Sequence, residues 1–175
     1  MVLAAVTDSF YKILLLVHIA LVIVGFGGVL WNPLYGQRAK QYGGAGGLAV
    51  SEANLDVNRF AEYCIYAVPI VGFALVGASS KAWTFSQTWV WLSIVLFIVG
   101  LGIAHAVLLP NAKKLVQAQR ELASAGAPPA GASGPPPQVA VMEAAGKKLQ
   151  TFGPVADLVL LVILYLMVFR PGGPF

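Results

Sequence analysis

The sequence predicts an all-α membrane protein, a bundle of four transmembrane helices with a helical hairpin extension in the cytoplasm. Three observations predict this fold. The 175 residues are 58% hydrophobic and 10% charged, with a mean hydropathy of +0.79, whereas soluble domains are roughly 45–50% apolar and about 25% charged. Four apolar segments approach the length of about 20 residues that a helix needs to cross the hydrocarbon core. None of them shows the alternation of a membrane barrel strand.

The first helix, about residues 10–32, contains the uncharged run Ile13–Trp31. Within this run His18 and Gly25 are seven residues apart and therefore share one helix face. A small residue and a polar ring on one face favour contact with another helix rather than with lipid. Because no small-x-small cleavage site follows the run, we expect this helix to be retained rather than cleaved as a signal peptide.

The next segments alternate between polar and apolar stretches. Residues 32–58 hold the glycine run Gly43–Gly47 and are expected to form a polar loop. The second apolar segment has Pro69 near its middle, where proline usually kinks a membrane helix. The third segment begins with Trp89 and Trp91, which together with Trp83 fit an interfacial aromatic belt.

After Pro110 the composition favours a continued helix that leaves the membrane. Residues 127–138 are rich in proline and glycine and are expected to form a flexible link. Pro154 suits the first turn of the fourth membrane segment. The sequence thus predicts one membrane domain, residues 1–175, with helices at about 10–32, 59–79, 88–125 and 139–170.

Basic residues predict the orientation. The connections 32–62 and 110–150 together hold eight lysines and arginines, and the remaining segments outside the membrane hold three. The positive-inside rule then places both large connections in the cytoplasm and both termini outside. Because the basic residues lie between apolar runs, we expect them to contact anionic lipid headgroups, and we expect no nucleic-acid partner.

Two histidines suggest a haem or metal ligand pair, but their depths disagree. At about 1.5 Å of rise per residue, His18 lies near the outer end of its helix and His105 near the inner end of the third. The resulting separation in depth is on the order of 15 Å. We therefore do not expect the two rings to share one iron or other metal. His18 alone remains a candidate cofactor ligand, with a hydrogen bond to a neighbouring helix as the alternative.

A second group of ionisable or thiol side chains is expected near the cytoplasmic face, and its members are Glu62, Cys64, His105 and Asp157. Such a layer is able to relay protons, bind a cation, or satisfy itself as a hydrogen-bonded structural pair. A separate set of glycines is expected to mark close helix packing: Gly25, Gly27, Gly28, Gly100 and Gly102.

Sequence motifs of catalysis are absent. The chain has no nucleophile elbow, HExxH or CxxC motif, and the glycine run is not followed by the GK[ST] of a phosphate-binding loop. The single cysteine, Cys64, excludes an intramolecular disulfide framework and a multi-cysteine zinc site. We therefore expect a protein that is not an enzyme and that binds no resident metal.

The stretch from Tyr11 to Leu34, YKILLLVHIALVIVGFGGVLWNPL, resembles a family of small bacterial four-helix integral membrane proteins of unknown function. The matching residues are His18 and the Gly25-Phe26-Gly27 turn. More distantly, the early histidine is similar to that of copper-resistance D-type proteins, some relatives of which carry haem or metal. The present chain departs from them because it lacks a second histidine at matching depth.

These observations predict an accessory or assembly subunit of a larger inner-membrane complex such as a respiratory complex or supercomplex. Its expected partners are other membrane protein subunits and membrane lipids. One alternative is a redox protein that binds haem or a metal through His18 or through the Glu62, Cys64, His105 and Asp157 layer. Another is a bundle that binds a lipid or a quinone.

Overall fold

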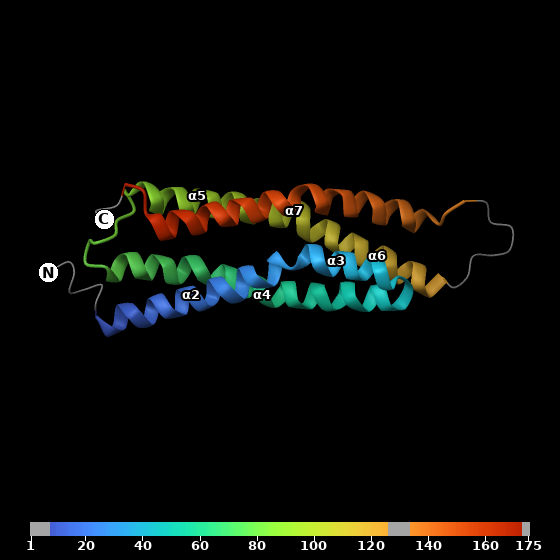
Figure 1. The fold of residues 1–175 in the computed structure, drawn as a ribbon, viewed down its shortest axis with the longest axis horizontal. Coiled ribbons are helices and arrows are strands. Elements are labelled where there is room, and N and C mark those ends of the chain that lie inside the picture. The colour runs from blue at the N-terminus through green and yellow to red at the C-terminus, as the bar shows by residue number, and fades with distance from the viewer. Residues whose placement is uncertain (1–7, 126–133, 173–175) are drawn as a thin grey trace. The chain divides into compact units, whose positions relative to one another are not determined.

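A computed structural model describes residues 8–125 and 134–172 of the chain, and the described residues are almost entirely helical, with no strand. This confirms the predicted all-α class. In chain order the elements are α2 (Ser9–Leu30), α3 (Asn32–Tyr42), α4 (Gly44–Ala78), α5 (Thr88–Ile103), the π-helical turn η1 (Ala104–Leu108), α6 (Leu109–Ala125) and α7 (Pro137–Phe169) (Figure 1).

Four helical segments are long and apolar enough to cross a membrane, which confirms the predicted number of spans. They are Ser9–Tyr42, Gly44–Ala78, Thr88–Ala125 and Pro137–Phe169, and they contain 34, 35, 38 and 33 residues. At a rise of about 1.5 Å per residue, each reaches roughly 50 Å. Since the hydrocarbon core is about 30 Å thick, each segment is long enough to span it and to extend beyond it.

The expected loop at 32–58 is wrong, because this stretch is helical. Pro33 lies in the first turn of α3, where its missing N–H is tolerated. The break between α3 and α4 is confined to Gly43 and Gly44, which both have positive φ. Gly47 lies inside α4, and a Cβ atom there would collide with the carbonyl oxygen of Ala39. The glycine run therefore forms a tight connection between two closely packed helices, α3 and α4, and not a flexible loop.

The two prolines expected to shape membrane helices both lie inside long helices, Pro69 in α4 and Pro154 in α7. Pro154 is therefore not in a first helical turn as predicted, because α7 already begins at Pro137. Most of the predicted link 127–138 falls on residues 126–133, which lie outside the described residues. Residues 134–136 are not helical.

The chain divides into two compact units. The span unit comprises Met1–Leu30, Asn58–Gly100 and Leu158–Phe175, and the polar unit comprises Trp31–Val57 and Leu101–Asp157. The span unit carries six charged side chains: Asp8, Lys12, Arg59, Glu62, Lys81 and Arg170. The other twelve charged side chains lie in the polar unit. The prediction of a single membrane domain stays a prediction.

Within the span unit, α2 and α4 pack through residues repeated every seven positions. The buried residues of α2 are Tyr11, His18 and Gly25, and on α4 Ala61, Val68 and Leu75 are buried with the same spacing. A strict seven-residue repeat is the pattern of helices that wind around one another. The contacts of Gly25 with Ile65 and of His18 with Gly72 show that the two helices run antiparallel.

The outer surface of the span unit is apolar. Large hydrophobic side chains are exposed on each of its helices, among them Ile13, Leu16, Ile23, Ile70, Ile98, Leu161 and Val168. A soluble protein rarely exposes so continuous an apolar surface. In a lipid bilayer this surface contacts acyl chains, which agrees with the integral membrane class.

Candidate functional site

The buried histidine of α2 lies in a gap left by a glycine of α4. His18 is 7% exposed. A Cβ atom built on Gly72 would stand 3.3 Å from the imidazole Cε1 and 3.7 Å from Nδ1. Any residue other than glycine at position 72 would therefore press on the imidazole. The sequence pattern singled out His18, but nothing in a single sequence indicated that Gly72 makes room for it.

The imidazole has one satisfied and one unsatisfied nitrogen. His18 is hydrogen-bonded to the backbone of Val68, and its buried Nδ1 has no hydrogen-bond partner among the described residues. A ring that donates to a carbonyl through Nε2 is the neutral tautomer whose Nδ1 carries a lone pair. His18 therefore keeps one buried acceptor that is chemically able to bind a donor or a metal ion.

The predicted packing glycines differ in what surrounds them. A Cβ atom on Gly25 would stand 2.9 Å from Ile65 Cγ1 and 3.1 Å from the Ile65 backbone nitrogen, which is too close. On Gly100 it would make an ordinary contact of 3.5 Å with Val159. Gly27 and Gly102 have nothing within 4 Å of such an atom, and Gly28 is partly buried in α2. Gly25 and Gly100 thus pack within the chain.

The predicted layer of four ionisable or thiol residues is divided between the two units. Glu62 and Cys64 belong to the span unit, and His105 and Asp157 belong to the polar unit. Glu62 accepts a hydrogen bond from the Tyr66 hydroxyl one turn later in α4. Within the described ranges, no group of three or more His, Cys, Asp and Glu side chains is placed to hold a metal. A single site built from the four residues stays a prediction.

His105 lies in the π-helical turn η1, and its side chain is exposed. This turn ends two residues before Pro110, which cannot donate to the carbonyl four residues earlier and would clash with it in a regular α-helix. Widening of the helix relieves that clash. π-helical turns occur frequently at functional sites, although here the proline accounts for the turn by itself.

A further cluster, which the sequence did not predict, closes one end of the span unit. It consists of Tyr11, Trp83, Trp89 and Arg170, and we call it the aromatic–arginine cluster. Trp83 is 8% exposed, and its Nε1 donates a hydrogen bond of 2.9 Å to the Tyr11 hydroxyl. The Trp83 and Trp89 rings meet edge to face with centroids 5.5 Å apart. The guanidinium carbon of Arg170 lies 4.4 Å from the centre of the Trp83 ring.

The connection between α4 and α5 holds this cluster in place. Ser79 is fully buried, and its hydroxyl donates to the Val76 carbonyl and accepts from the Trp83 backbone N–H. The side-chain carbonyl of Gln87 accepts a hydrogen bond of 3.2 Å from Trp89 Nε1, while its amide donates to the Ala82 carbonyl. The tryptophans were predicted as an interfacial belt, but pairing them with Tyr11 and Arg170 required the folded chain.

The polar unit contains an open groove and an ion pair. The groove has a volume of about 490 Å³ and lies between α6 and the start of α7, where Lys114, Gln117, Glu121 and Gln138 line it. Arg120 donates to Glu52 at 2.5 Å and so joins α6 to α4 within this unit. Arg120 is mostly exposed and Glu52 is partly exposed, and ion pairs open to solvent contribute little to stability.

The model of a family described as predicted integral membrane protein, DUF2269, matches residues 12–171. This chain belongs to the DUF2269 family. The match covers nearly all of the first span, the other three spans, His18 and Arg170, and it confirms the predicted resemblance to integral membrane proteins of unknown function. No curated protein and no solved structure matches the chain.

Membership of the DUF2269 family shows that the protein lies in a membrane, but it identifies no reaction. The family description and the four apolar helices agree that the chain is an integral membrane protein surrounded by lipid. The distant resemblance to copper-resistance D-type proteins stays a prediction, as do the inner-membrane location and the orientation of the termini.

Proposed function

We propose that this DUF2269 protein is a non-catalytic subunit that assembles with other membrane proteins in a bacterial inner membrane. The observation that carries the proposal is the uncovered face of the third span. In every span few residues of the most apolar window are buried within the chain, 6% in the third and 11–17% in the others, so each span keeps surface that a partner can cover. A span that its own chain covers so little is available to a second protein.

The small residues of this face support a protein partner in addition to lipid. Gly102 is exposed, with nothing within 4 Å of a Cβ position, and Ala106 is exposed four residues later. Small residues at this spacing let helix backbones approach closely in membranes. Exposed positions that contact only acyl chains have no need of a small residue, and the neighbouring exposed positions Ile98 and Val99 are large.

The host that we propose is a respiratory complex or supercomplex. The chain has no sequence motif of a catalytic site, so its packing surfaces are its most developed feature. An accessory subunit needs such surfaces and no reactive groups of its own. The choice of a respiratory host follows from this accessory character and is the part of the proposal that the experiment tests first.

The test is a native gel of the tagged full chain, extracted from its own membranes in mild detergent, with mass spectrometry of each band. We expect a band of several hundred kilodaltons that contains respiratory subunits. Gly102→Leu should release the chain from this band. The matched variant Gly77→Leu fills an equally open glycine of α4 and should leave the band intact. A chain that migrates alone as a small oligomer would overturn the proposal.

One observation favours a second function, the binding of haem or a metal through His18. The unpartnered Nδ1 of this buried ring carries a lone pair, and a neutral imidazole nitrogen is a common metal ligand. Such a protein would be coloured after purification, and the Soret band of a haem would vanish in His18→Ala. A colourless wild-type protein that contains no stoichiometric metal would exclude this function.

A further inference from the structure

Three backbone outliers of the described chain gather around one tryptophan. The non-glycine residues with positive φ are Ser80 at 48°, Lys81 at 70° and Arg170 at 46°. Ser80 and Lys81 stand in the connection that carries Trp83, and Arg170 contacts the Trp83 ring. The left-handed conformation costs roughly 1–2 kcal/mol for an ordinary residue. Such strain concentrates at ligand-binding and other functional positions.

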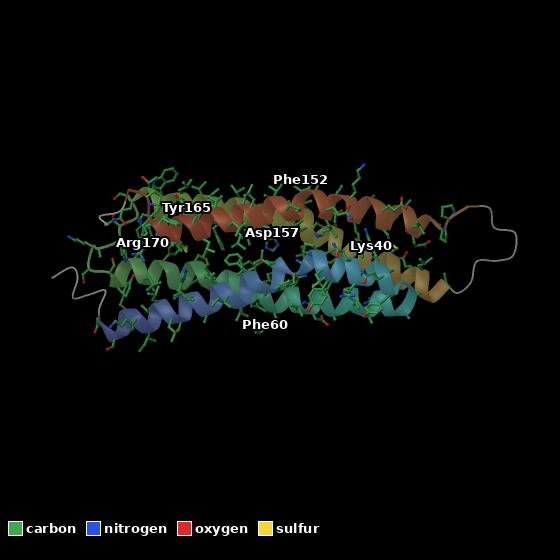
Figure 2. All side chains as sticks on the ribbon, in the orientation of Figure 1. Lys40, Phe60, Phe152, Asp157, Tyr165 and Arg170 are labelled. Carbon is green, nitrogen blue, oxygen red and sulfur yellow. The ribbon has the colours of Figure 1, made fainter. Side chains whose placement is uncertain are left out.

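Arg170 follows directly after α7, at a position where helices usually place glycine. Glycine would adopt this conformation without strain, and the chain has glycines at 172 and 173. Arginine here places a charged side chain at the end of α7 at the cost of this backbone strain. Figure 2 shows Arg170 close to Tyr165 at the end of α7.

The guanidinium of Arg170 is held in a corner formed by two tryptophans. Its central carbon lies 4.4 Å from the centre of the Trp83 ring and 5.9 Å from that of Trp89, and the two rings are inclined at 83°. Both indole N–H groups already donate to protein acceptors. The rings are thus fixed, and they present their negatively polarised faces to the cation.

Among the described residues, most N–H donors of this guanidinium find no acceptor. Nε donates to the Met167 carbonyl at 3.3 Å. Among residues 8–125 and 134–172, no hydrogen bond or carboxylate ion pair engages its two terminal nitrogens. These nitrogens carry four of the five N–H groups of arginine. A planar fork with free donors matches the two oxygens of a phosphate.

Lysines adjoin members of the cluster in the chain, and an apolar surface lies beside Arg170 on α7. Lys12 follows Tyr11 and Lys81 comes two residues before Trp83, whereas Asp8 is the acidic residue that precedes them in the described chain. Beside Arg170 on α7, Tyr165 and Phe169 stack with centroids 4.6 Å apart, and both are exposed. A ligand with an anionic head and an apolar tail fits both features.

We propose that the aromatic–arginine cluster binds the phosphate of an anionic phospholipid, with the Arg170 guanidinium as the phosphate ligand and the exposed end of α7 against an acyl chain. Tryptophans are enriched where membrane meets water, which is the depth of the headgroups. The net positive charge around the cluster selects an anionic headgroup over a zwitterionic one.

The test is native mass spectrometry of the purified full chain in detergent, titrated separately with phosphatidylglycerol and with phosphatidylcholine of the same acyl chains. We expect the wild-type protein to bind the anionic lipid at least about fivefold more tightly. Arg170→Gln should abolish this preference. Lys147→Gln removes a cation of the polar unit and should keep it. Equal binding of the two lipids by the wild type would overturn the proposal.

A conservative variant covers the case in which Arg170→Gln does not fold. Arg170→Lys keeps the charge over the tryptophans but loses the planar fork, so we expect the anionic preference to fall about threefold. An unchanged preference would overturn the role of the fork. Inorganic phosphate at millimolar concentration should not displace the lipid. Complete displacement would identify a site for free anions and overturn the lipid assignment.

Discussion

Gly25 and Gly27 stand two residues apart in α2 and meet different surroundings. Gly25 is buried against α4, with Ile65 atoms too close for a methyl group, whereas Gly27 has open space around it. Both were expected from the sequence to be packing residues, because small residues in an apolar helix all look alike without the partner helix. The contact on α4 is what separates them.

The first prediction uses this pair as a matched comparison. Gly25→Ala forces Ile65 and the α4 backbone to move, so we expect it to destabilise the protein by about 1–3 kcal/mol. Gly27→Ala adds a methyl group in open space and should be neutral or slightly stabilising, since alanine favours helix. Thermal unfolding in one detergent measures both variants. Equal melting temperatures for the two would contradict the α2–α4 contact.

The second prediction concerns the imidazole and the glycine that accommodates it. Gly72→Val adds three side-chain carbons against His18 and should lower the stability clearly, while His18→Ala opens space at the same point. In the double variant the valine fills the space left by the ring. We expect a favourable coupling energy of about 0.5–3 kcal/mol in a double-mutant cycle. Additive effects of the two substitutions would show that the residues are not in contact.

At the scale of elements, α3 and the first part of α4 distinguish the structure from a generic four-span protein. Residues 32–57 form helix in spite of five glycines between 32 and 47 and one proline. Gly47 permits the backbone of α4 to pass close to Ala39, so glycine here serves packing. From Leu48 onwards the sequence is rich in ordinary helix formers.

Hydrogen exchange measures this element directly. With the full chain in lipid nanodiscs, we expect the backbone amides of 35–42 and 48–57 to be protected, because they are bonded within α3 and α4. Gly134, the one residue of 134–136 that has a backbone amide, lies outside any helix and should exchange quickly. Rapid exchange throughout 32–57 would restore the loop that the composition suggested.

The spans were predictable because apolar length and low charge are sufficient to identify a membrane helix. The continuation of the third helix to Ala125 also agreed with the sequence, since good helix formers follow Pro110. The aromatic–arginine cluster was not predictable, because Tyr11, Trp83 and Arg170 are far apart in the chain. The fit of His18 against Gly72 depends on the register of two helices, which the sequence of neither one reveals.

At the scale of the whole molecule, two units share four continuous helical segments. The span unit has an apolar surface and few charges, and the polar unit carries most of the charged side chains. The molecule is therefore a membrane protein of the DUF2269 family, and its proposed task is contact with other proteins. Its third span, with Gly102 and Ala106 exposed, is where that contact is expected.

The most direct measurement is photo-crosslinking in the native membrane, with a photoreactive side chain at Ala106. The account predicts adducts with a specific membrane protein, identified by mass spectrometry as a subunit of a respiratory complex. The same probe at Leu164, an exposed position of α7, serves as the matched control and should give lipid adducts or background. If the probe at position 106 formed adducts only with lipid, this result would contradict the proposal that this face binds a protein.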